Sequence, residues 1–192
     1  GSHLMLGEIV TTLALEPDEP ETDHCGTCRR CVDACPTQCI TPYSVDASRC
    51  ISYLTIEHRS EIDPSLHEPM GDWLFGCDVC QDVCPFVQKA DSERPAGTVA
   101  GYETKPRHFD LLAVLNWSED DRREAFVKSA MKRAKLPMIK RNALIAAGNH
   151  LRDHDDAALR RRIEQIAADP EEPALARRTA EQLLDRSDPA RR

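Results

Sequence analysis

The chain has 192 residues, of which 41% are hydrophobic and 5% aromatic, so it can form one large or two small domains with a real core. Its formal net charge of −8 at pH 7 argues against indiscriminate binding of nucleic acid. No apolar stretch approaches the length of a membrane span, and we expect a cytoplasmic protein with no membrane partner.

The chain does not begin like a natural protein. Residues 1–5 resemble the remnant of an expression tag and are not expected to belong to the fold. Residues 6–23 are expected to be the remnant of a preceding domain or a linker. Their β-prone stretch has no partner strand, and such a strand is not stable alone. We therefore expect that a domain has been lost ahead of residue 6.

Eight of the nine cysteines form two linked sets within residues 24–90. The first run reads Cys25-x2-Cys28-x2-Cys31-x3-Cys35-Pro36, and the second is Cys50 followed, after an insertion, by Cys77-x2-Cys80-x3-Cys84-Pro85. In bacterial ferredoxins the fourth cysteine of such a run binds the other cluster. The spacing therefore predicts a first 4Fe–4S cluster on Cys25, Cys28, Cys31 and Cys84. It predicts a second cluster on Cys35, Cys50, Cys77 and Cys80.

Other uses of these cysteines fit the pattern less well. Zinc takes cysteines in Cys-x2-Cys pairs, but a third cysteine at the same spacing followed by Cys-x3-Cys-Pro is not zinc-like. Disulfides need an oxidising compartment, and no signal peptide is visible. Cys39 lies outside both sets, and we interpret it as a small buried hydrophobe.

The segments between and after the cysteines are less regular. Residues 31–35 and 80–84 are expected to open or sit on short helices. The apolar alternation of Ile51–Glu57 favours a strand or a strand-to-helix switch. Residues 91–109 are rich in Pro, Gly and polar side chains and are expected to form a linker.

From Asp110 the apolar period becomes helical. Ser118 and the acids after it begin a helix that places Phe126, Ala130 and Ala134 on one face and ends at Pro137. A second helix covers Ile139–Ala147 and is closed by Gly148 and Asn149.

Two further helices complete this region. The third opens at Asp155 and points Leu159, Ile163 and Ile166 inward. The fourth has Pro173 in its first turn and packs Leu175, Ala180 and Leu183. Short helices with brief connections favour a HEAT-like helical-repeat domain over residues 110–192. The expected fold class is α+β, mostly α, with a dicluster ferredoxin-like domain followed by that helical domain.

The net charge conceals a basic island. Residues 122–152 contain nine Lys and Arg residues and one acid, whereas residues 1–24 contain six acids and no Lys or Arg. A solvated helix face is the usual role of such residues. The alternative is a stripe that contacts consecutive phosphates. We take as candidate nucleic-acid contacts Lys128, Lys132, Lys135, Lys140 and Arg141.

Four runs of the chain resemble epoxyqueuosine reductases, which complete the synthesis of queuosine in bacterial tRNA. In chain order these runs are His24–Thr37, Arg49–Glu57, Gly76–Pro85 and Arg141–Asn149. The resemblance implies an oxidoreductase in which electrons pass through two 4Fe–4S clusters to cobalamin, which deoxygenates epoxyqueuosine. It also implies that HEAT-like helices help to bind the tRNA.

The resemblance implies the partners as well: a tRNA with a queuosine-type anticodon and an electron donor such as a flavodoxin or ferredoxin. We expect a monomer. Cobalamin would be bound mainly by an N-terminal domain that this chain does not match, so no catalytic residue is assigned and the chain alone is expected to be inactive. Candidate cobalamin contacts are Thr55, Glu57 and Asp78.

The alternative functions are a stand-alone dicluster electron carrier with a helical protein- or RNA-binding tail, and a helical binding scaffold with structural clusters.

Overall fold

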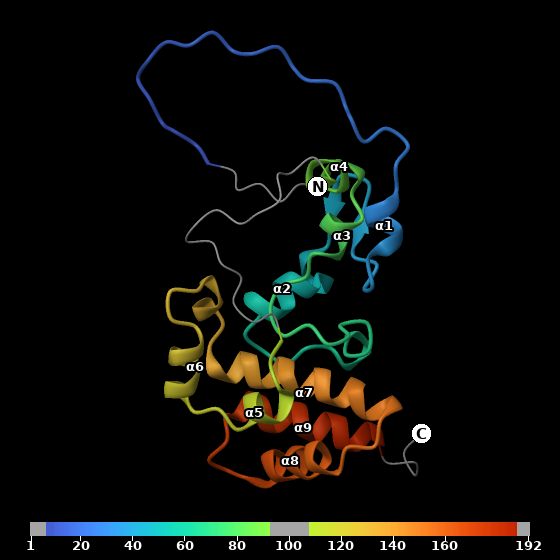
Figure 1. Ribbon diagram of the computed structural model, residues 1–192, viewed down its shortest axis with the longest axis vertical. Coiled ribbons are helices and arrows are strands. Elements are labelled where there is room, and N and C mark those ends of the chain that lie inside the picture. The colour runs from blue at the N-terminus through green and yellow to red at the C-terminus, as the bar shows by residue number, and fades with distance from the viewer. Residues whose placement is uncertain (1–6, 93–107, 188–192) are drawn as a thin grey trace.

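The computed structural model describes residues 7–92 and 108–187. They form an elongated molecule in which a cysteine-bearing half stands above a helical body (Figure 1). The cysteine-bearing half comprises residues 24–50 and 77–92, and the insertion, residues 51–76, lies between it and the helical body. Most of the predicted linker 91–109 lies outside the described residues.

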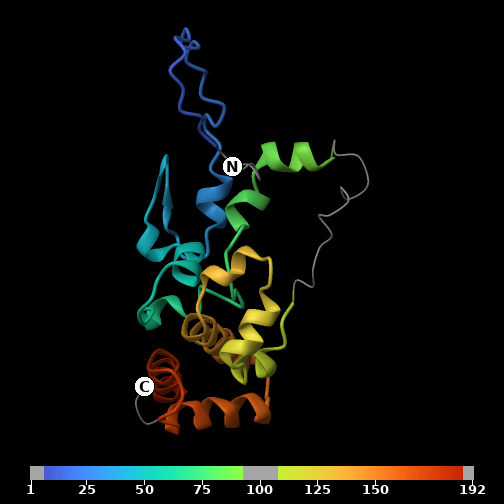
Figure 2. The same ribbon diagram turned by 90° about the vertical axis from the view of Figure 1, so that its left-hand side faces the viewer.

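The elements up to residue 92 are short. They are α1 (Arg30–Ala34), β1 (Ile40–Thr41), β2 (Ser44–Val45), the 3₁₀ helix η1 (Ala47–Arg49), α2 (Ile51–Ile56), the 3₁₀ helix η2 (Pro64–Leu66), α3 (Val79–Asp82) and α4 (Pro85–Ser92). Strands β1 and β2 pair antiparallel, with Ile40 opposite Val45. Helices α1 and α3 coincide with the short helices predicted at the two cysteine runs, and they pack side by side (Figure 2).

Residues 7–23 contain neither helix nor strand. Ile9 and Val10 are 92% and 98% exposed, and the segment loops away from the rest of the molecule (Figure 1). Backbone donors and acceptors of a lone strand have no neighbour with which to pair, so the β-prone composition of this stretch produces no strand.

Residues Ile51–Ile56 are helical throughout, so neither the strand nor the strand-to-helix switch expected over Ile51–Glu57 is formed. Helix α2 begins directly after Cys50 and buries Ile51, Leu54 and Thr55, which lie on one helical face. The segment is also rich in β-prone residues. In a helix, however, Ile51 and Leu54 lie on one face and pack in the same apolar cluster as Ile145 of α7.

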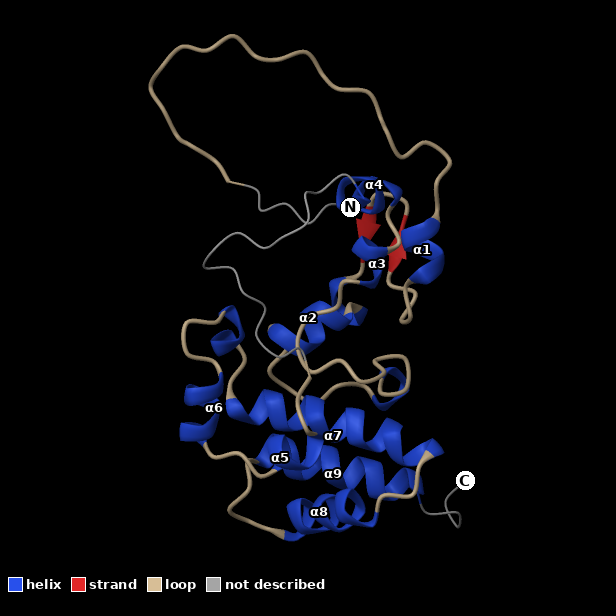
Figure 3. Ribbon diagram, viewed as in Figure 1, coloured by secondary structure: helices blue, strands red, loops and turns tan. Residues whose placement is uncertain are grey.

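The helical body contains the main apolar core. Its elements are α5 (Leu111–Leu115), α6 (Glu119–Ala125), the 3₁₀ helix η3 (Ala130–Arg133), α7 (Leu136–Asp153), α8 (Ala157–Ala168) and α9 (Ala174–Ser187). Helix α9 packs against both α7 and α8, and α5 packs against α7 (Figure 3). As predicted, Leu159, Ile163 and Ile166 of α8 are buried. The repeat character of this body stays a prediction.

The long helix predicted after Ser118 is broken. The capping box between Ser118 and Asp121 starts α6 as expected, but the helix ends at Ala125. The chain then passes through Lys128, whose φ of 56° is left-handed, into η3. Phe126 and Ala134 are buried as predicted, whereas Ala130 is exposed.

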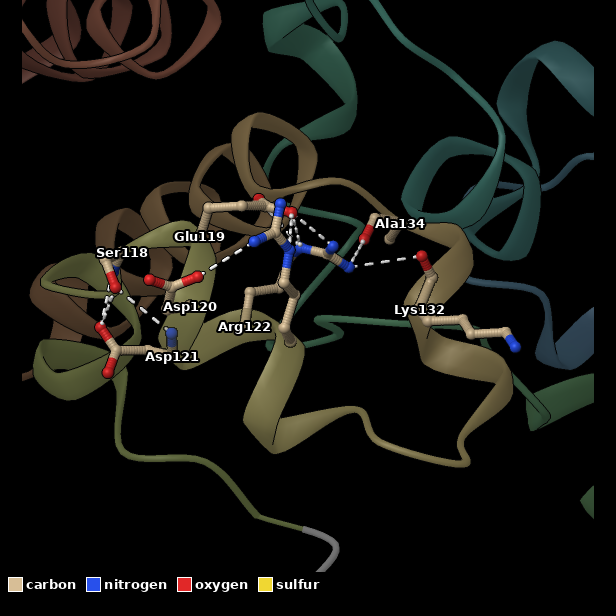
Figure 4. Close-up of polar contacts among 8 residues, drawn as sticks. Ser118, Glu119, Asp120, Asp121, Arg122, Lys132 and Ala134 are labelled. Carbon is tan, nitrogen blue, oxygen red and sulfur yellow. Dashed lines mark hydrogen bonds and ion pairs between the residues drawn. The ribbon is translucent and has the colours of Figure 1, made fainter.

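A buried arginine explains this break (Figure 4). Arg122 is 5% exposed and forms an ion pair with Glu119. Its Nη1 also donates to the carbonyl oxygens of Lys132 and Ala134, at 3.3 and 3.2 Å. These contacts fold η3 back along α6, which a continuous helix would not allow.

Helix α7 is twice as long as predicted. Pro137 lies in its first turn and does not end a helix. The helix also passes straight through Gly148 and Asn149, which were expected to close it. A Cβ at Gly148 would come within 2.6 Å of Cδ2 of Leu183 on α9, so the Leu183 side chain would have to shift to admit it. The absent side chain permits close approach of two helices.

Candidate metal centres

The first cysteine run surrounds α1. Cys25 and Cys28 are exposed, and the backbone N–H of Cys28 donates to the Cys25 carbonyl in a tight turn. Gly26 occupies this turn with a φ of +51°, a conformation that L side chains rarely adopt. Cys31 and Cys35 are half-buried at either end of α1.

The second run is tied to the first at Cys35. Burial raises the pKa of the Cys77 thiol, and the nearby Cys80, Cys50 and Cys35 raise it further. Burial likewise raises the pKa of Cys80, with contributions from Cys50, Cys31 and Cys35. The packing of α1 against α3 therefore brings Cys31 and Cys35 of the first run close enough to act on the thiols of the second run.

The far ends of the two runs also approach each other. The rings of His24 and Phe86 make an edge contact with centroids 6.4 Å apart. His24 precedes Cys25, and Phe86 lies two residues after Cys84. Nη1 of Arg30 donates to Oε1 of Gln88 at 3.4 Å, which also links α1 to α4. This is the neighbourhood in which the spacing predicts a set of Cys25, Cys28, Cys31 and Cys84.

Cys39 is buried, as expected of a small hydrophobe, but it is not isolated. Its Sγ lies 3.4 Å from Sγ of Cys35, and it is 5% exposed. Burial raises the pKa of Cys39 to about 12. Burial also acts to raise the pKa of Cys35, but hydrogen bonds from the backbone of Cys39 and the hydroxyl of Thr37 outweigh it and lower that pKa. Cys35 is therefore the thiol of this pair that more readily becomes a ligand.

The donor chemistry of the two sets fits iron–sulfur clusters. None of the nine cysteines, all of which are described, forms a disulfide. Across residues 7–92 and 108–187, no three His, Cys, Asp or Glu side chains converge as around one metal ion. A cubane takes its four thiolates at separate iron atoms, so its ligands stand farther apart than those of a single ion.

The three candidate cobalamin contacts have different surroundings. Thr55 is fully buried, its hydroxyl donates to the Ile51 carbonyl, and it accepts from the backbone N–H of Gly76 at 2.9 Å. It cannot reach a cofactor, and its prediction as a contact is wrong. The Glu57 carboxylate pairs with Arg133, and Asp78 is exposed at the start of α3. Of the two carboxylates, that of Glu57 is paired, and that of Asp78 makes no side-chain contact among the described residues.

The basic island is mostly neutralised within the protein. Four of its five arginines form ion pairs with acids outside the island: Arg122 and Arg123 with Glu119, Arg133 with Glu57, and Arg152 with Glu68. Lys128, Lys132 and Lys135 are exposed, and the side chain of Lys132 extends away from the Arg122 contacts (Figure 4). These lysines do not share one helix. Lys128 lies in the loop between α6 and η3, Lys132 lies in η3, and Lys135 directly precedes α7.

Lys140 and Arg141 do not belong to this surface. Lys140 is 5% exposed and its Nζ forms an ion pair with Glu172 at 2.7 Å. Arg141 is fully buried and faces the insertion. Sequence position placed both residues at the start of a helix, where they were expected to be accessible, but α7 already begins at Leu136 and buries this turn. Their prediction as nucleic-acid contacts is wrong.

The sequence assigned no role to Asn142 and placed Asn149 only at the end of a helix. Asn142 donates to the carbonyls of Thr55 and Leu74, and Asn149 donates to those of His67 and Gly71. The signal was present in the run Arg141–Asn149, where three strongly polar side chains interrupt an apolar helix. Polar groups that are buried almost always have partners, so such a run indicates contacts with another segment.

Comparison with known proteins supports the cysteine sets. A family model described as a 4Fe-4S double cluster binding domain matches residues 24–87. An epoxyqueuosine reductase of Synechocystis sp. is 44% identical over 145 residues, which are 74% of this chain and 50% of that protein. Another, from Cellulophaga algicola, is 46% identical over 150 residues, covering 74% of this chain and 46% of that one.

Solved structures give the same relationship. A crystal structure of epoxyqueuosine reductase with an epoxyqueuosine-modified tRNA-Tyr stem loop matches with a TM-score of 0.75 and 30% identity, over 91% of this chain and 45% of that one. A structure of the Bacillus subtilis enzyme matches with a TM-score of 0.69 and 29% identity, over 92% and 46%. The chain thus spans about half the length of the relatives it matches.

Within the described residues, none of the helices combines the length and apolar character that a membrane crossing requires.

Proposed function

We propose that this chain is the electron-transfer and tRNA-binding part of an epoxyqueuosine reductase. It aligns with about half of the length of such enzymes. Two bound 4Fe–4S clusters would supply single electrons for the deoxygenation of epoxyqueuosine to queuosine in tRNA. Following the family resemblance, the electrons are destined for cobalamin, to which this chain contributes at most the neighbourhood of Asp78.

The observation that supports the proposal is that α1 packs on α3, so that the two cysteine runs lie together. Cys31 and Cys35 of the first run both act electrostatically on the thiol of Cys80, and Cys35 also acts on that of Cys77. We propose that Cys35 completes the second set with Cys50, Cys77 and Cys80. A protein that bound one zinc ion at each run would have no need to exchange cysteines between the runs. The exchange is the arrangement of dicluster ferredoxins.

The chain's own residues would hold and shield the clusters. Six of the eight ligand cysteines are half-buried or buried, which limits access of water and oxidants to their sulfur atoms. Cys25 and Cys28 are exposed and would leave one edge of the first cluster open. We propose that this edge receives electrons from the external donor.

Iron and acid-labile sulfide analysis of the anaerobically purified chain tests the metal content. We expect about eight iron and eight sulfide atoms per chain, as two cubanes require. On reduction, we also expect the visible absorbance of both clusters to decrease. Replacement of Cys39 by Ser serves as the control and should leave both counts unchanged. Two zinc ions per chain and no sulfide would contradict the proposal.

We propose that tRNA binds to the surface formed by Lys128, Lys132 and Lys135. Their ammonium groups are exposed, whereas the other bases of the island are paired or buried. One of the solved relatives holds a tRNA stem loop, which supports an RNA partner for this chain. Phosphate contacts by lysine release counterions, so each contact contributes to the salt dependence of binding.

Charge reversal tests this surface. In the full-length enzyme, Lys128→Glu with Lys132→Glu should weaken tRNA binding at least tenfold and reduce the slope of log K against log salt by about two. Arg161→Glu on α8 is the matched control, because Arg161 is equally exposed on a different helix, and it should change neither quantity. An unchanged salt slope in the double variant would exclude these lysines as phosphate contacts.

A further inference from the structure

One buried arginine of the helical body makes most of its hydrogen bonds outside that body. Arg141 on α7 is fully buried, and its Nη1 donates to the carbonyls of His58 and Ser60, both at 2.7 Å. Its Nη2 donates to the carbonyl of Leu54 at 2.5 Å. All three acceptors belong to the insertion, which α2 begins directly after Cys50.

Asn142 extends these contacts toward the other end of the insertion. Its Oδ1 accepts from Nε and Nη2 of Arg141, so the two side chains orient each other. Its Nδ2 donates to the carbonyl of Thr55 at 3.0 Å and to that of Leu74 at 2.9 Å. One amide group therefore links α2 to the segment that leads into Cys77.

Thr55 completes the link on the side of the cysteines. Its hydroxyl accepts from the backbone N–H of Gly76 at 2.9 Å, and Gly76 directly precedes Cys77. The same hydroxyl donates to the carbonyl of Ile51 at 2.8 Å, and Ile51 directly follows Cys50. Cys50 and Cys77 are 27 residues apart in the sequence, yet the same short set of side chains fixes the backbone beside both.

We propose that Arg141, Asn142 and Thr55 are positioning residues for the second cysteine set, so that the helical body fixes the placement of Cys50 and Cys77 around their cluster. The proposal rests on the function proposed above, since it requires a cluster on Cys35, Cys50, Cys77 and Cys80. Groups that hold metal ligands in place typically affect metal affinity by about 10- to 100-fold. The first set makes no contact with these three residues among the described contacts and provides an internal reference.

The chain offers a matched pair of variants on one helix. Asn142 and Asn149 both lie on α7, and each donates two hydrogen bonds to carbonyls of the insertion. Asn142 bonds Thr55, five residues after Cys50, and Leu74, three residues before Cys77. Asn149 bonds His67 and Gly71, ten and six residues before Cys77. Asn142→Ala and Asn149→Ala therefore separate the positioning of ligands from a general contribution to stability.

The measurement is made on anaerobic protein that contains both clusters. We expect Asn142→Ala to change the electron paramagnetic resonance signal and the midpoint potential of one reduced cluster, and to accelerate release of about four of the eight iron atoms to a chelator by about tenfold or more. Asn149→Ala should lower the unfolding temperature and leave both signals as in the unaltered chain. Equal changes in the two variants, or no change in either, would overturn the proposal.

Thr55→Val covers the outcome in which Asn142→Ala does not fold. Valine has nearly the shape of threonine but cannot accept the hydrogen bond from Gly76. We expect the same selective change in one cluster, and an unaltered spectrum would overturn the proposal. If the unaltered chain itself lacks eight iron atoms, it is the proposed function that fails, so the two failures are distinguishable.

Discussion

The cysteine-bearing half and the helical body differ in what holds them together. In the helical body, one cluster of buried apolar side chains joins α5, α7, α8 and α9. In the cysteine-bearing half, the buried apolar side chains among the described residues are Cys39, Cys84 and Val87. So little apolar burial contributes little to the stability of a folded region. We infer that bound clusters replace the missing core in the upper half.

The insertion belongs with the helical body, although the sequence places it between the cysteines. Ile51, Leu54, Ile62, Leu66 and Met70 form an apolar cluster with Ile145 of α7. Three acids of the insertion also pair with arginines of the helical body: Glu57 with Arg133, Glu61 with Arg178, and Glu68 with Arg152. The part of the molecule that depends on its own core therefore includes α2 and ends next to Cys50 and Cys77.

The largest expected effect follows from removing the metal. Chelation of iron under anaerobic conditions should abolish hydrogen-exchange protection in α1 and α3, because metal binding and folding are coupled where no core exists. The amides of α7 and α8 should keep their protection. Hydrogen exchange followed by mass spectrometry measures both regions in one experiment. Equal loss of protection in the two halves would show that they form one cooperative unit.

The second effect concerns the junction of insertion and body. Arg141→Met should lower the free energy of unfolding by about 3–5 kcal/mol, because three carbonyl groups and the buried Asn142 lose their donor. Arg123→Met is the control, since Arg123 is 66% exposed and pairs with Asp120 on the surface. Its cost should stay below about 1 kcal/mol. Similar denaturation midpoints for the two variants would contradict a structural role for Arg141.

A smaller effect is expected where α7 meets α9. Gly148→Ala places a methyl group against Leu183, and overpacking of this kind costs about 1–3 kcal/mol, partly offset by a gain in helix propensity of about 1 kcal/mol. We expect a net loss of stability. In a Leu183→Ala background the same substitution should become stabilising by up to about 1 kcal/mol, because only the propensity gain remains. A gain in the unaltered background would show that Gly148 is not needed for packing.

The smallest effect is the pH dependence of the Glu119 contact. The hydrogen bond from Arg122 lowers the pKa of Glu119 below its usual value of 4.5. The contact therefore stabilises the fold above pH 4.5 and is lost as the pH falls through the folded-state pKa. Glu119→Gln should cost at most about 1 kcal/mol at pH 7, because this carboxylate is partly solvated. The difference between the two proteins should shrink below pH 4.5 in thermal unfolding, and a constant difference would exclude the charged contact.

The same contrast between the halves explains what the sequence could predict. Ligand spacing is local, so the cysteine sets and the short helices around them follow from the chain itself. Burial is not local. Arg141 and Lys140 count as surface charges in a sequence, and only the packing of α7 shows that they are enclosed.

Two helix boundaries failed for a related reason. Glycine is common after helices and also where helices cross closely, and only the position of Leu183 decides between these roles for Gly148. The helical period continues from α6 through η3, but contacts of Arg122 with the carbonyls of Lys132 and Ala134 interrupt the helix. For Gly148 the deciding contact comes from another helix. For Arg122 it joins residues 10 and 12 positions apart, beyond the three- and four-residue spacing of a helical pattern.

The exchange of cysteines between the runs is tested most directly by single Ser variants of the anaerobic chain. Electron paramagnetic resonance should show that Cys35→Ser loses the same cluster as Cys50→Ser, although Cys35 lies in the first run. Cys28→Ser should lose the other cluster. If Cys35→Ser instead matches Cys28→Ser, each run holds its own cluster and the crossed assignment is wrong.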